Sequence, residues 1–139
     1  MGAIFSRKSE RRVLVLGLDN AGKTSNIKFL NSALVTLFKE KEPPTKTVPT
    51  VGFDVKTFNT SKFKVNAWDV GGQDSIQHLW HHYFENTNAL LYLVDSTDTV
   101  RLENSAASLK DSLSYPELRA TPVLILCNKV DIEGGRLVF

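Results

Sequence analysis

Along the first half of the chain, the pattern of apolar and polar residues indicates strand-like segments and a helix-like segment. The apolar run at residues 12–16 predicts a buried first strand, and apolar residues recur at helical spacing from Lys23 onward. The amphipathic helix predicted there ends before Pro43, because a proline disfavours helical geometry in the residue that precedes it. Residues 53–58 and 63–68 alternate apolar and polar side chains, and the polar link between them predicts a hairpin.

The second half of the chain continues this alternation. Helices are predicted at residues 75–84 and 100–113, and buried strands at residues 89–94 and 123–127. Strands that alternate with helices are typical of an α/β fold with a mostly parallel sheet flanked by helices. No internal repeat and no shift in composition marks a second domain, so the pattern predicts one domain.

Composition narrows the class of protein. The hydrophobic fraction of 42% is ordinary for a soluble globular chain, and a net charge of +2 is too small to indicate a nucleic-acid partner. Cys127 is the single cysteine, which excludes an internal disulfide, and its apolar neighbours predict a buried thiol in a reducing compartment. No apolar stretch approaches the ~18 residues that cross a membrane, and no secretory leader is visible. We therefore expect a cytoplasmic or peripherally membrane-bound protein.

The turn between the first predicted strand and the first predicted helix carries a chemical motif. Residues 17–24 read GLDNAGKT and match the phosphate-binding loop (P-loop) pattern G-x-x-x-x-G-K-[ST]. The glycines let successive backbone N–H groups face phosphate oxygens, and the start of the helix adds a partial positive charge. Lys23 is expected to reach the β- and γ-phosphates, and the Thr24 hydroxyl to bind Mg²⁺. Further contacts with the nucleotide are assigned to Asp19, Asn20, Ala21 and Gly22.

A P-loop alone leaves ATPases, kinases and GTPases open, and a second motif separates them. Asn128, Lys129 and Asp131 belong to the sequence NKVD, which directly follows the last predicted strand, at the edge where ligands bind in open α/β sheets. A carboxylate there accepts two hydrogen bonds from the N1–H and exocyclic amine of guanine, whereas adenine offers no such pair. Taken alone, NKVD also fits a polar turn. Together with the P-loop, it favours guanine over adenine.

Two segments between these motifs are suited to sensing a γ-phosphate. The sequence WDVGGQ at residues 68–73 places Asp69 at a strand end, where a carboxylate holds Mg²⁺, often through water. Gly72 is expected to offer its backbone N–H to the γ-phosphate, and Gln73 to orient the attacking water. Upstream, Thr50 in the sequence PTVG is expected to join the Mg²⁺ shell only while a triphosphate is present, although on its own it also fits a turn residue.

These motifs together closely resemble the ADP-ribosylation-factor-like branch of small GTPases. The resemblance covers residues 13–131 and includes PTVGF, the tract LWHHYFENT at residues 79–87 and the strand end at residues 94–96. It implies a P-loop small-GTPase fold, a GTP/GDP cycle with slow GTP hydrolysis, and two switch segments, around Thr50 and around residues 71–84. It also implies exchange factors, GTPase-activating proteins and effectors as partners, and a role in membrane trafficking or in recruiting effectors to organelles.

We interpret the N-terminus, residues 1–12, as a membrane-facing arm. Gly2 lies in the myristoylation pattern M-G-x-x-x-[ST] and is the expected acylation site. One acyl chain binds membranes at only ~10⁴ M⁻¹, so a second contact is required, and Ile4 and Phe5 with four basic residues are candidates for it. The basic residues also fit a solvated arm. Because the arm is short, we expect a loose and reversible membrane association.

Two regions depart from the family pattern. Residues 38–48 are longer than the corresponding segment, which predicts a more mobile first switch or one that addresses a different partner. Residues 132–139 (IEGGRLVF) do not resemble the further helix, last strand and final helix of the family. We therefore interpret residues 13–131 as an incomplete domain in which the strand at residues 123–127 becomes an exposed edge. This leaves a second hypothesis, an interaction module without turnover or a non-functional isoform, in either case with weak nucleotide binding.

Histidines and tryptophans carry weaker signals. His78, His81 and His82 have a helical spacing that fits a zinc site, but no further cysteine or histidine is near in sequence, so a partner-facing surface is favoured. Trp68 and Trp80 fit either an effector-binding surface or plain burial.

Overall fold

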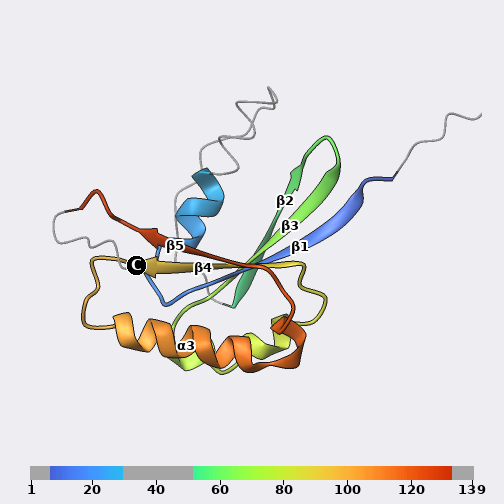
Figure 1. Ribbon diagram of the computed structural model, residues 1–139. Helices are drawn as coiled ribbons and strands as arrows, with labels where there is room; N and C mark the ends of the chain where they lie inside the picture. The colour runs from blue at the N-terminus through green and yellow to red at the C-terminus, as the bar shows by residue number, and fades with distance from the viewer. Residues whose placement is uncertain (1–6, 30–51, 133–139) are drawn as a thin grey trace, which may run out of the picture.

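The computed structural model describes residues 7–29 and 52–132 (Figure 1). Within these ranges the chain forms a five-stranded sheet in the order β2-β3-β1-β4-β5. Strands β1, β3, β4 and β5 run parallel to one another, and β2 pairs with β3 antiparallel as the expected hairpin. The α/β class and the mostly parallel sheet are therefore confirmed. The strands are β1 (Ser9–Leu16), β2 (Phe53–Asn59), β3 (Phe63–Val70), β4 (Ala89–Asp95) and β5 (Val123–Asn128).

Helices cover both faces of the central strands (Figure 1). Residues 23–29 are the described part of the helix that follows β1, and α3 (Leu102–Ser114) lies on the opposite face. Side chains alternate along β1 accordingly: Leu16 packs in the cluster that includes residues of α3, and Val15 packs in the cluster that includes Ile27. Strands buried on both faces read as continuous apolar runs, which is why the sequence pattern located them.

The first strand is longer than the apolar pattern predicted. Residues 9–11 extend β1 beyond the predicted start and pair in parallel with residues 63–65 of β3, although all three are exposed. Backbone pairing with the hairpin forms this extension without burial of side chains, so hydrophobic periodicity gave no sign of it. Arg11 and Arg12 consequently lie within the sheet.

The single helix predicted over residues 75–84 was wrong. The segment contains α2 (Asp74–Gln77) and the 3₁₀ helix η1 (Trp80–Tyr83) instead. Three-residue spacing recurs in its hydrogen bonds, from Leu79 N to Ile76 O and from His82 N to Leu79 O. The tighter turns accompany the burial of Trp80, which is only 3% exposed and donates its indole N–H to Gly71 O at 2.9 Å. A second 3₁₀ helix, η2 (Pro116–Leu118), precedes β5.

At one edge of the described sheet, β5 leaves apolar side chains in contact with solvent. Leu124 is 58% exposed and Ile125 is 50% exposed, as expected for an edge strand. Cys127 is half-buried, so the prediction of a buried thiol was wrong. Across residues 7–29 and 52–132, no helix combines the length and the apolar character that a membrane span requires.

Candidate functional site

The P-loop joins β1 to the helix that begins at residue 23, and its lysine turns back into it. The ammonium of Lys23 donates hydrogen bonds to Gly17 O and Leu18 O, both at 2.8 Å. The residue is only 6% exposed, and this burial lowers its pKa to about 8, although the charges of Asp69 and Asp19 act in the opposite direction. A buried ammonium at the centre of a P-loop is suited to binding phosphate, because water screens its positive charge little there.

The remaining P-loop carbonyls accept hydrogen bonds from three side chains in distant parts of the fold and from Asn26 in the helix that follows the loop. All six carbonyls from Gly17 to Gly22 are hydrogen-bonded in this way or by Lys23. Because the protein holds these oxygens, the loop keeps a curled conformation of the kind that binds anions through backbone N–H groups in other P-loops. The four further bonds are Arg101 Nη2 to Asp19 O at 3.3 Å, Lys129 Nζ to Asn20 O at 2.6 Å, Asn128 Nδ2 to Ala21 O at 2.9 Å and Asn26 Nδ2 to Gly22 O at 2.9 Å.

The two predicted Mg²⁺ ligands nearest the P-loop come together. Thr24 Oγ1 donates to Asp69 Oδ2 at 2.5 Å, and Asp69 is 2% exposed at the end of β3. A hydroxyl and a carboxylate are hard oxygen donors, which match the preference of Mg²⁺ for oxygen ligands with several positions left to water or phosphate. The residues present therefore fit a magnesium ion. Among the described residues, no group of three or more His, Cys, Asp or Glu side chains forms a further metal site, so the spacing of His78, His81 and His82 does not assemble one.

The segment after β3 lies directly on the P-loop. Asp19 N donates to Gly72 O at 3.0 Å, and Gly71 N donates to Gly52 O at 2.8 Å. A Cβ atom on Gly72 would lie 2.2 Å from Gly17 O and 2.5 Å from Lys23 Nζ, so only glycine fits this close approach. Gln73 follows at the N-terminus of α2 with an exposed side chain.

The NKVD motif is tied to both the P-loop and the end of β4. Lys129 Nζ contacts Asp95 Oδ2 at 2.7 Å, in addition to Asn20 O. Burial acts to raise the pKa of Asp95, but hydrogen bonds from Lys129 and Thr97 outweigh it and leave that pKa below its ordinary value. The backbone carbonyl of Asn128 accepts from Ser96 Oγ at 2.7 Å. Asp131 is exposed at the end of this turn.

Sequence reasoning missed two acidic residues and one arginine that shape this region. Asp95 has a weak sequence signal, since it closes a buried strand at the ligand-binding edge. Arg101 and Asp98 match no motif, and only the ion pairs that Arg101 forms with Asp19 and with Asp98 identify them. Thr50 and Gly2 lie outside the described residues, as does the long segment at residues 38–48.

An aromatic cluster, Phe53–Trp68–Tyr83, lies where the hairpin meets η1. The rings of Phe53 and Trp68 stack at 5.1 Å between centroids, and Tyr83 lies 5.4 Å from Phe53. The Arg12 guanidinium lies 3.9 Å from the Trp68 ring centroid and donates to Tyr83 O at 2.7 Å. Phe53 is 49% exposed, so this cluster presents aromatic surface to solvent. Trp80, in contrast, is buried.

One known protein family matches this chain over nearly its whole length. The family model described as "ADP-ribosylation factor family" matches residues 1–136. The chain belongs to the ADP-ribosylation factor family. The resemblance read from the motifs is thereby confirmed.

Relatives within the ADP-ribosylation factor family agree with this assignment. The chain is 41% identical over 129 residues to ADP-ribosylation factor-like protein 2 of Drosophila melanogaster, which covers 93% of this chain and 65% of the relative. It is 40% identical over 129 residues to ADP-ribosylation factor-like protein 3 of Chlamydomonas reinhardtii, covering 93% of this chain and 68% of the relative. The chain thus spans about two thirds of the length of both relatives.

A solved structure shares the fold. The Arl6 BBS3 small GTPase from Trypanosoma brucei, determined with the bound nucleotide analogue GppNp, superposes with a TM-score of 0.78 at 28% sequence identity. The match covers 92% of this chain and 72% of that one. The small-GTPase fold expected from the resemblance is confirmed.

Proposed function

We propose that this chain binds guanine nucleotides with Mg²⁺ and acts as a GTP/GDP switch that hydrolyses GTP slowly. The observation that carries the proposal is the direct contact between the two nucleotide motifs. Asn128 and Lys129 of NKVD donate to the P-loop carbonyls of Ala21 and Asn20. A phosphate-binding loop and a guanine-selective turn are thus parts of one site. The GppNp bound to the Trypanosoma relative supports a nucleotide as the ligand.

Roles for individual residues follow from their positions. Lys23 and the P-loop backbone from Asp19 to Gly22 hold the phosphates, and Asp131 accepts from the guanine edge beside Asn128 and Lys129. Thr24 and Asp69, joined by Thr50, hold Mg²⁺, which neutralises charge on the β- and γ-phosphates when bound. Gln73 orients the water that attacks the γ-phosphorus as the bond to the β–γ bridging oxygen breaks, giving GDP and phosphate.

Slow turnover and switching both have a structural rationale. Unaided hydrolysis in a related GTPase proceeds at ~10⁻⁴ s⁻¹ and is accelerated ~10⁵-fold by a partner's arginine, and we assign that role here to a GTPase-activating protein. A γ-phosphate that accepts a hydrogen bond from the Gly72 N–H acts on the same peptide segment whose Gly72 O accepts from Asp19 N. The triphosphate therefore repositions the segment that leads into α2 and η1. Exchange factors and effectors then distinguish the two states, with the Phe53–Trp68–Tyr83 cluster as a contact surface.

We further propose that the protein is cytoplasmic and reversibly membrane-associated, with Gly2 myristoylated and the switch serving membrane trafficking or effector recruitment. The myristoylation pattern supports the lipid. Its weak single-chain anchoring supports reversibility.

Equilibrium titration of the purified chain with a fluorescent GDP analogue and Mg²⁺ tests the nucleotide proposal. Binding should resist competition by ATP, and Asp131→Ala should lower the affinity by roughly 30- to 100-fold, because two hydrogen bonds to a charged acceptor are lost. Asp111→Ala, which removes an exposed carboxylate on α3, is the matched control and should bind as the wild type does. A folded wild-type chain that binds no GDP would refute the proposal and favour an interaction module that presents the aromatic cluster.

A further inference from the structure

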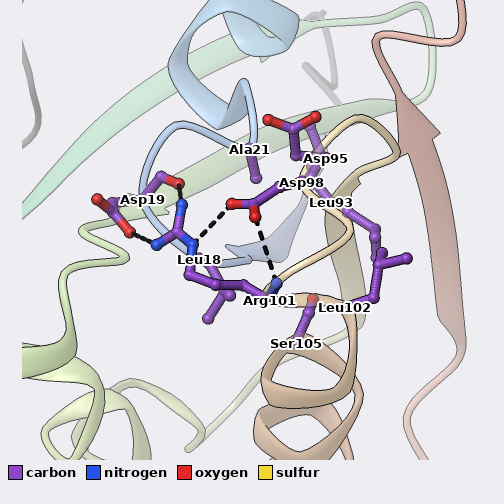
Figure 2. Close-up of a pocket in the computed structure, with 10 residues that line it drawn as sticks. Leu18, Asp19, Ala21, Leu93, Asp95, Asp98, Arg101, Leu102 and Ser105 are labelled. Carbon is purple, nitrogen blue, oxygen red and sulfur yellow. Dashed lines mark hydrogen bonds and ion pairs between the residues drawn. The ribbon is translucent and has the colours of Figure 1, made fainter. Parts of the chain in front are cut away.

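Arg101 lies outside every nucleotide-binding motif, in the connection between β4 and α3, yet its guanidinium reaches the P-loop (Figure 2). Nη1 forms an ion pair with the carboxylate of Asp19, and Nη2 donates to the backbone carbonyl of the same residue at 3.3 Å. Nε donates to Asp98 Oδ2 at 2.6 Å. All three guanidinium nitrogens are therefore used to connect the P-loop to the start of α3.

The position of Arg101 is itself fixed by the fold. Its backbone N–H donates to Asp98 O at 3.2 Å and to Asp98 Oδ1 at 3.3 Å. Its carbonyl accepts from Ser105 N at 2.9 Å, the first hydrogen bond of α3. Hydrogen bonds to Asp19 and then Asp98 raise the pKa of Arg101 above its ordinary value, so the charge is permanent. The P-loop is thus attached to a cation held by a thirteen-residue helix.

Arg101 contacts Asp19, whose charge and backbone both bear on how the P-loop binds phosphate. Asp19 is a carboxylate within a loop built for phosphate, and the next residue, Asn20, has a left-handed backbone with φ of 61°. A non-glycine residue in that region needs support from its surroundings. Arg101 supplies it by fixing the carbonyl of Asp19, while Lys129 fixes the carbonyl of Asn20. The same ion pair neutralises a negative charge that would otherwise repel a phosphate.

We propose that Arg101 is a positioning residue for nucleotide retention, which holds the P-loop through Asp19 and cancels the charge of that carboxylate. This inference rests on the proposed nucleotide binding. It assigns Arg101 no contact with the nucleotide. Its effect is therefore expected in the rate at which bound nucleotide leaves, and it is expected to depend on whether Asp19 is charged.

The test is the dissociation rate of a fluorescent GDP analogue, chased with excess GDP in the presence of Mg²⁺. Arg101→Ala should raise this rate about tenfold, because it frees the loop and leaves Asp19 uncompensated. Arg101→Lys should raise it less, since it keeps the charge but not the fork of donors. The double variant Arg101→Ala with Asp19→Asn should dissociate GDP more slowly than Arg101→Ala alone, because the repulsive charge is gone. A purely structural role for Arg101 would not produce this rescue.

Controls separate the possible outcomes. Lys64→Ala removes an exposed ion pair with Glu10 on the far part of the sheet and should leave the rate unchanged. The inference would be overturned if the wild type binds GDP and Arg101→Ala does not change the dissociation rate. It would also be overturned if the effects of the two single substitutions multiply in the double variant. Both outcomes leave the proposed nucleotide binding intact. Failure of the wild-type chain to bind GDP would overturn both. If Arg101→Ala does not fold, Arg101→Gln, which keeps most of the side-chain length but not the charge, gives the same comparison with and without Asp19→Asn, and absence of rescue there overturns the inference.

Discussion

The phosphate end and the base end of the candidate site differ in how completely the protein itself holds them. At the phosphate end, six consecutive carbonyls accept hydrogen bonds, and Lys23 is almost fully buried. At the base end, Asn128 and Lys129 direct their side chains to the P-loop, while the carboxylate of Asp131 is exposed. The strand that leads to this end, β5, also leaves apolar side chains in solvent.

Because of this difference, we expect the phosphate end to supply most of the affinity for nucleotide and the base end to supply the selectivity for guanine. A pre-organised phosphate end loses little conformational entropy when it binds, so most of the affinity should come from there. In the proposed function, selection of guanine depends on Asp131, which lies in the turn after the edge strand β5. The two ends are joined by Asn128 and Lys129, so a change at that junction should weaken both ends together.

Gly22→Ala is the change with the largest expected effect on GDP affinity, because it disturbs the contact between the P-loop and Asn128. Gly22 has φ of +94°, and a Cβ atom there would lie 2.1 Å from Asn128 Nδ2. The methyl group must displace the amide that holds Ala21 O, and the residue must also adopt a strained left-handed backbone. Together these cost about 2–3 kcal/mol, which equals a roughly 30- to 150-fold loss of GDP affinity in an equilibrium titration.

Gly52→Ala is the matched control for Gly22→Ala. It imposes a similar strain at φ of +83°, but its Cβ atom meets no atom within 4 Å. It should lower the free energy of unfolding while keeping GDP affinity within about threefold of the wild type. Equal losses of affinity in both variants would show that backbone strain, and not the junction with Asn128, is responsible.

The pH dependence of GDP binding probes the phosphate end alone. Burial lowers the pKa of Lys23 to about 8, so the ligand-free protein loses this charge as the pH rises above 8. Phosphate binds the charged amine, and affinity should therefore fall about tenfold between pH 7 and pH 9. Stability of the ligand-free protein should follow the opposite sign. Between pH 8 and the ordinary lysine pKa of 10.5, the unfolded chain binds more protons, so the Lys23 contribution to the unfolding free energy rises with pH.

Lys23→Arg is the control for that profile, since a guanidinium keeps its charge throughout this range. Ionisation of the guanine N1–H at alkaline pH affects both proteins, so the Lys23 effect is the difference between their two profiles. Identical profiles would show that Lys23 stays charged in the ligand-free state.

Local sequence patterns predicted the buried strands well, and they predicted poorly the segments whose structure depends on contacts with other elements. The apolar runs that became β4 and the buried end of β1 were located because burial on both faces leaves a continuous signal in sequence. The exposed start of β1 carries no such signal, since its backbone pairing with β3 does not require apolar side chains. The helical spacing of residues 75–84 was overridden by a tertiary contact, the bond from Trp80 to Gly71 O.

In the candidate site, too, the residues in local motifs could be predicted and those that depend on tertiary contacts could not. Residues of the P-loop and NKVD lie in contiguous motifs whose chemistry is local, and the structure brings them together. Arg101 contacts Asp19 across 82 positions of sequence, and nothing in its neighbourhood distinguishes it from a surface arginine. A residue that acts through another residue can be found only when the fold places the two side by side.

Leu124→Lys has the smallest expected effect and tests how exposed the base end is. Leu124 is 58% exposed on β5, so a lysine should change the free energy of unfolding by less than about 0.5 kcal/mol and leave GDP affinity unaltered. It should also reduce self-association at high concentration, because charge on an edge strand opposes pairing between chains. A urea titration measures both variants, and Leu93→Ala on the neighbouring strand β4, where the side chain is fully buried, should cost about 2–5 kcal/mol in it. A loss of that size in Leu124→Lys would mean that β5 is covered in solution, and the base end would then be as firmly held as the phosphate end.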